Sequence, residues 1–74
     1  MYITIELQST PTSIAHLETV TDTLPQAEQV YHTILSAAAV SEVPIHSAVL
    51  MDSSGYVLKQ DTYVHSQEEE ENAD

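Results

Sequence analysis

Four histidines are the side chains of this sequence best suited to metal binding or general-base chemistry near neutral pH. A zinc-binding helix of the HExxH type holds its two histidines within one helical turn of each other. The closest pair here, His32 and His46, lies much farther apart along the chain than that. A shared site for His16, His46 and His65 would require their strands to be adjacent and in register. We therefore expect solvated or edge histidines, with no bound metal ion or other cofactor.

Nucleophilic and phosphate-binding motifs are equally weak in this chain. Ser53 and Ser54 precede Gly55 in what is best explained as a hairpin tip, whereas a catalytic serine of the G-x-S-x-G type lies on a strand-to-helix elbow. A phosphate-binding loop needs several glycines and the chain has one, and with no cysteine there is neither a thiolate nucleophile nor a disulfide. We therefore expect a protein that is not an enzyme.

The charge balance is the strongest chemical signal. The 74 residues include 12 acidic side chains and a single base, Lys59, which gives a net charge of −11. Direct nucleic-acid binding is excluded, because it needs several Lys or Arg side chains to displace counterions from phosphates. Soluble domains usually interleave both signs of charge, so this surface favours a cationic partner. The candidate contacts are the carboxylates of the folded part other than turn-forming Asp52: Glu6, Glu18, Asp22, Glu28, Glu42 and Asp61.

The chain divides into one small domain, residues 1–66, and an acidic tail, residues 67–74, which we expect to be disordered. Residues 2–8 alternate in the manner of a half-buried strand, with Ile3, Ile5 and Leu7 on one side. Residues 14–21 alternate less cleanly, with Leu17 on the side opposite to Ile14, His16, Glu18 and Val20, and predict a second strand.

A helix follows, and two further strands close the domain. Thr23 and Gln26 have the spacing of a capping box, and Val43-Pro44 lies beyond the expected helix end near residue 40 or 41. The helix carries one apolar stripe: Ala27, Val30, Tyr31, Ile34, Leu35 and Ala38. Residues 45–51 and 56–65 are extended segments joined by a turn at residues 52–55. The sequence predicts an α+β fold: an antiparallel sheet of three or four strands in β-β-α-β-β order, with one helix packed on one face.

A single helix leaves the other face of such a sheet uncovered and gives a thin core for a small chain. Homodimerisation through the open face or through a sheet edge would supply additional burial. The alternative is a monomer whose open face is polar, as antiparallel sheets allow.

In size, negative charge, lack of arginine and compact α+β layout, the chain resembles the small acidic inhibitors of phages and other mobile elements, notably anti-CRISPR proteins that mimic nucleic acid. The resemblance implies a stoichiometric inhibitor that occupies the basic, nucleic-acid-binding surface of a target such as a CRISPR effector. Two other interpretations remain. The chain could be a homo-oligomeric accessory protein that uses its open sheet face, or its acidity could be an adaptation to high salt.

The sequence contains no membrane-spanning apolar run and no basic region of a signal peptide near its N-terminus, so we expect a protein of the bacterial or archaeal cytoplasm.

Overall fold

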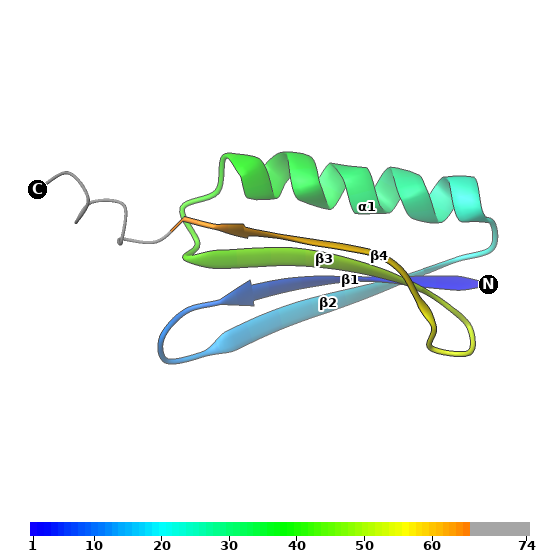
Figure 1. The fold of residues 1–74 in the computed structure, drawn as a ribbon, viewed down its shortest axis with the longest axis horizontal. Coiled ribbons are helices and arrows are strands. Elements are labelled where there is room, and N and C mark those ends of the chain that lie inside the picture. Colours follow the sequence, from blue (N-terminus) through cyan, green and yellow to red (C-terminus); the bar gives the residue numbers. More distant parts are fainter. Residues whose placement is uncertain (66–74) are drawn as a thin grey trace, which may run out of the picture.

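The fold is known from a computed structural model that describes residues 1–65; the predicted acidic tail, residues 67–74, lies outside the described residues. The elements follow in the order β1 (Tyr2–Ser9), β2 (Ile14–Thr21), α1 (Leu24–Ala39), β3 (Ile45–Asp52) and β4 (Val57–Val64), as Figure 1 shows. The predicted α+β fold and its β-β-α-β-β order are confirmed. Within residues 1–65, no helix is both long and apolar enough to cross a membrane.

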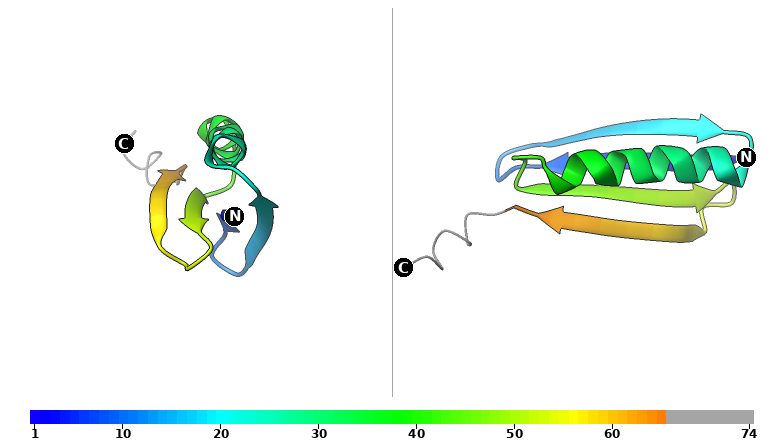
Figure 2. Two further views of the ribbon diagram at one scale, coloured as in Figure 1. Left: turned by 90° about the vertical axis from the view of Figure 1, so that its right-hand side faces the viewer. Right: turned by 90° about the horizontal axis from the view of Figure 1, so that it is seen from above.

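All strand pairs in the sheet are antiparallel, and the spatial order is β2-β1-β3-β4. The two central strands are therefore β1 and β3, while β2 and β4 form the edges. In the central pair, Thr4 lies opposite Leu50 and Ile5 lies opposite Val49. Since α1 connects β2 to β3, it crosses over β1 and lies along one face of the sheet (Figure 2).

The hairpin between β3 and β4 forms as its turn residues predict. The Asp52 carboxylate accepts hydrogen bonds from the hydroxyl of Ser54 at 2.6 Å and from its backbone amide at 2.9 Å. These bonds, together with one from the Tyr56 amide, lower the pKa of the Asp52 carboxyl. Gly55 has a φ of 93°, a left-handed conformation that side chains larger than hydrogen rarely adopt.

The N-terminus of α1 is closed by the predicted capping box. Thr23 Oγ1 accepts from the Gln26 amide at 3.3 Å, and Gln26 Oε1 accepts from the Thr23 amide at 3.2 Å. The helix buries Ala27, Tyr31, Ile34 and Ala38, a spacing that confirms the predicted stripe.

The face of the sheet that α1 covers is the more polar of the two. Thr4 is fully buried beneath the helix and its hydroxyl donates to the Ala27 carbonyl oxygen at 3.4 Å. Ala48 and Leu50 of β3 lie on the same face and belong to the same core. Because neighbouring side chains of a strand point to opposite faces, Ile3, Ile5 and Leu7 lie on the face that α1 leaves uncovered.

We call this uncovered side the open face. Strand alternation and register assign to it an apolar set: Ile3, Ile5, Leu7, Ile14, Val20, Ile45, Val49, Met51 and Val64. A register shift between Leu50 and Met51 pairs Met51 with Val57 at the start of β4. Its polar members are Ser9, His16, Glu18, Ser47, Gln60 and Thr62. The alternative of a polar open face is therefore wrong.

Candidate interaction surfaces

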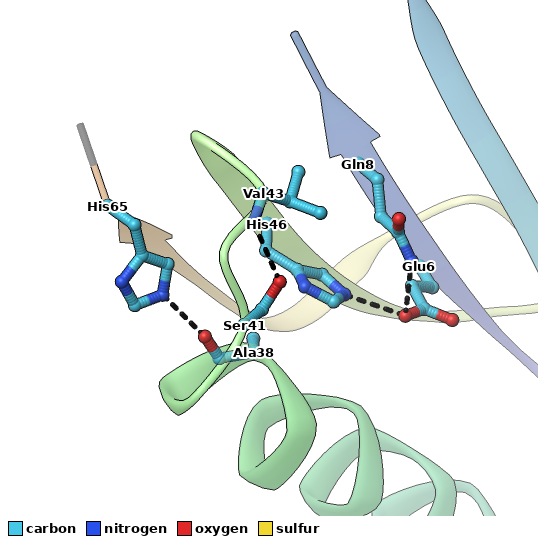
Figure 3. Close-up of polar contacts among 7 residues, drawn as sticks. All are labelled: Glu6, Gln8, Ala38, Ser41, Val43, His46 and His65. Atoms are coloured by element: carbon cyan, nitrogen blue, oxygen red, sulfur yellow. Dashed lines mark hydrogen bonds and ion pairs between the residues drawn. The ribbon is translucent and has the colours of Figure 1, made fainter. Parts of the chain in front are cut away.

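The four histidines do not converge, and three of them have partners in the structure. His46 Nε2 lies 2.6 Å from Glu6 Oε2, His65 Nε2 lies 2.6 Å from the Ala38 carbonyl oxygen, and His16 Nδ1 lies 2.8 Å from Glu18 Oε2. Figure 3 shows the first two of these contacts, which link β1 to β3 and the end of α1 to the end of β4. Among residues 1–65, no three metal-binding side chains come together.

The contact between Glu6 and His46 is the most buried pair of charged or titratable side chains among the described residues. The imidazole is 4% exposed and the carboxylate 21% exposed, and Gln8 Nε2 donates to the same carboxylate oxygen at 3.2 Å. An ionised carboxylate can only accept, so the proton lies on His46 Nε2. His46 Nδ1 is buried without a hydrogen-bond partner. The pair joins two central strands on the helix-covered face.

Three of the six predicted contact carboxylates are already engaged within the chain. Glu6 holds His46 beneath the helix, and Glu18 pairs with His16 on the open face. Glu28 of α1 forms an ion pair with Lys59 of β4, with 3.3 Å between Oε2 and Nζ. Sequence reasoning missed the Glu6 and Glu28 pairings because they depend on strand register and on the packing of the helix. The Glu18 pairing is local, and the alternation that puts His16 and Glu18 on one side of residues 14–21 was a signal for it.

The other three predicted carboxylates are exposed and lie around the helix layer. Asp22 precedes the N-terminus of α1, Glu42 follows its C-terminus, and Asp61 lies on the helix-side face of β4. Burial raises the pKa of the Tyr31 phenol in α1, and the negative charge of Asp61 raises it further. We call Asp22, Glu42 and Asp61 the acidic helix side. The structure thus divides the six carboxylates between two faces instead of gathering them in one patch.

This acidic surface has almost no positive charge to balance it. Lys59 is the only lysine or arginine in the chain, and Glu28 already neutralises it. The surface potential over the helix layer is therefore negative, and an approaching cationic surface would be attracted at long range.

A shallow cavity of about 280 Å³ lies between α1 and edge strand β2. Its walls mix apolar and polar side chains: Glu6, Leu17, Thr19, Gln29, Val30, Thr33 and Ile34. The one titratable group among them is the Glu6 carboxylate, which His46 and Gln8 already occupy.

The open face is the second surface, and apolar side chains from all four strands contribute to it. Its edge-strand members project strongly, with Ile14 66% exposed, Val20 57% and Val64 52%. Its central members Ile5 and Val49 are partly covered by their own neighbours in the sheet. Contiguous exposed apolar side chains of this kind are typical of interaction surfaces.

Comparison with known proteins does not narrow the choice between these surfaces, since no protein-family model, curated protein or solved structure matched the chain.

Proposed function

We propose that this chain is a binding protein, with no catalytic activity, that inhibits its target in a one-to-one complex. Its acidic helix side would occupy a basic surface that otherwise holds nucleic acid. The observation that carries the proposal is the pairing of the chain's only lysine with Glu28, which leaves Asp22, Glu42 and Asp61 exposed and unbalanced. The resemblance to acidic phage inhibitors suggests a CRISPR effector as the target.

The spacing of these carboxylates suits a groove made for a nucleic acid. Asp22 and Glu42 flank a helix of 16 residues, which is about 24 Å long. That length equals about seven nucleotide steps at 3.4 Å each. Lysine and arginine side chains lining such a groove could form charge-assisted hydrogen bonds with carboxylates at both ends of α1.

The proposal is tested by one charge reversal on each face of the molecule. Glu42→Lys changes the acidic helix side, and Glu18→Lys makes the same chemical change at an exposed position of the open face. Binding and inhibition are measured with purified candidate effectors, with and without competing DNA. We expect Glu42→Lys to weaken binding by about tenfold, and Glu18→Lys to change it much less.

Equal losses in the two variants would indicate a general effect of net charge, and no loss in either would refute the use of the acidic helix side. Adaptation to high salt makes a different prediction, namely that the isolated protein unfolds when salt is removed.

A second function, that of a homo-oligomeric accessory protein, is favoured by a different observation, the apolar character of the open face.

A further inference from the structure

No element of residues 1–65 covers the open face, because α1, the one helix in this part of the chain, packs on the opposite face. Three of the fully buried side chains of the helix-covered core are alanines, Ala27, Ala38 and Ala48, and Leu50 is the one large side chain that the strands contribute to it; Tyr31 and Ile34 come from α1. Most of the aliphatic side chains of the strands therefore lie on the side that α1 does not cover. Burying these side chains would add substantially to the stability of a fold of this size.

Residues 66–74 do not have the side chains needed to cover that face. Residues 66–74 consist of Ser, Gln, Glu, Asn, Ala and Asp, with no apolar side chain larger than that of an alanine. Covering Ile5 and Val49 requires apolar side chains of similar size.

A second copy of the chain has both the shape and the charge to do so. The open face carries one carboxylate, Glu18, and it is paired with His16 at 2.8 Å. The unpaired carboxylates Asp22, Glu42 and Asp61 lie away from this face. Two strongly acidic chains therefore repel each other least when they approach through their open faces.

The area is also sufficient for a specific dimer. Four strands of eight residues cover roughly 26 by 19 Å at about 3.3 Å per residue and 4.8 Å per strand. Contact between two such faces buries roughly 1,000 Å² if each face is treated as flat, and projecting side chains add to this area. An area of that size is the minimum expected of a biological interface.

We propose that two copies associate open face to open face through a two-fold axis, giving two stacked sheets with a helix on each outer side. Central residues Ile5 and Val49 lie opposite each other on adjacent strands and become the middle of the interface. The two acidic helix sides remain outside. The open face and the acidic helix side share no residues, so this association does not depend on the identity of any other partner.

Two substitutions of opposite charge test the proposal. Val49→Glu has only neutral cross-strand neighbours, Ile5 and Gln60. Ile5→Lys lies across from the opposite charge of Glu18. A single folded chain should therefore tolerate either charge. In the dimer, both place a charged side chain at the centre of an apolar interface. The matched control is Leu17→Glu, a 62% exposed residue on the helix-side face of β2.

The masses of the proteins are measured by light scattering during gel filtration, and their folding by circular dichroism. We expect the unmodified chain and Leu17→Glu to have twice the 8.1 kDa mass of one chain. Both open-face variants should be folded monomers, with dimer dissociation constants raised by about a hundredfold.

The melting temperature of the unmodified chain supplies a test that needs no variant, since it should rise with protein concentration if the chain is a dimer. A monomer with a concentration-independent melting temperature would overturn the proposal. A dimer that survives both Val49→Glu and Ile5→Lys would overturn it as well, and would instead indicate pairing through an edge strand.

Discussion

At the scale of single residues, the two Glu–His pairs are chemically alike but differ in environment. His46 is 4% exposed at its contact with Glu6, whereas His16 is 59% exposed at its contact with Glu18. A buried polar group that loses its partner costs free energy, while an exposed pair contributes little because water replaces it.

Removing each carboxylate should therefore have unequal effects on stability. We expect Glu6→Ala to lower the free energy of unfolding by between about 1 and 3 kcal/mol, and Glu18→Ala to lower it by less than about 1 kcal/mol. Urea unfolding of both variants measures this difference, and each removes one negative charge, so the change in net charge is matched. Equal values would show that burial does not strengthen the Glu6 pair.

Tyr31 makes stability depend on pH in the alkaline range. Burial and then the negative charge of Asp61 raise the pKa of its phenol above the ordinary value of 10.0. The folded state therefore disfavours the phenolate. This contribution to stability is complete below the pKa of the unfolded chain and is lost as the pH rises through the folded value.

Tyr31→Phe keeps the ring and removes the ionisable group. We expect this variant to lose less stability than the unmodified chain between about pH 9 and 11. The free energy of unfolding of both proteins is measured in urea across that range. Groups that both proteins share titrate equally in both, so the difference between the two free energies reports on Tyr31 alone. Parallel curves for the two proteins would contradict this assignment.

At the scale of the elements, the small side chains under α1 explain its position. Ala27 and Ala48 are fully buried between helix and sheet, and Thr4 bonds directly to the helix backbone. A helix can lie this close only where the sheet presents small residues.

Ala48→Leu should therefore force α1 away from β3 and lower the free energy of unfolding by about 1 to 3 kcal/mol. The control is Ala37→Leu, the same substitution at an exposed position of the same helix, which should have little effect. Thermal unfolding compares the two. An unaffected Ala48→Leu variant would show that the helix is not tightly seated.

Local patterns predict the elements well because their causes are local. The capping pair Thr23 and Gln26, the turn at Asp52 and Gly55, and the alternation in residues 2–8 each act within a few residues. The face that α1 selects could not be read from alternation alone, because a strand with one apolar and one polar face fits either choice. The alanines of the helix stripe are the signal that favoured the polar, small-residue face.

The long-range pairings of the predicted site residues Glu6 and Glu28 could not be obtained in this way. Glu6 and His46 are 40 residues apart in the chain. Their contact follows from the pairing of β1 with β3, and Glu28 meets Lys59 only because α1 lies across the sheet. Composition predicts a negative surface, and the topology decides which carboxylates remain available on it.

At the scale of the whole molecule, the two proposed binding surfaces lie on opposite sides. We propose that the open face holds two copies together through apolar contacts and that the acidic helix side faces outward to meet a basic surface. Salt affects these contacts in opposite directions. Screening weakens attraction to a basic partner, but it reduces repulsion between two chains of charge −11.

Sedimentation equilibrium of the unmodified protein, from low to about 1 M salt, measures whether the open faces associate. We expect the mass of two chains, with a dissociation constant that stays constant or falls as salt is added. The mass of a single chain at every protein concentration, or a dimer that dissociates in high salt, would show that the open faces do not hold two copies together.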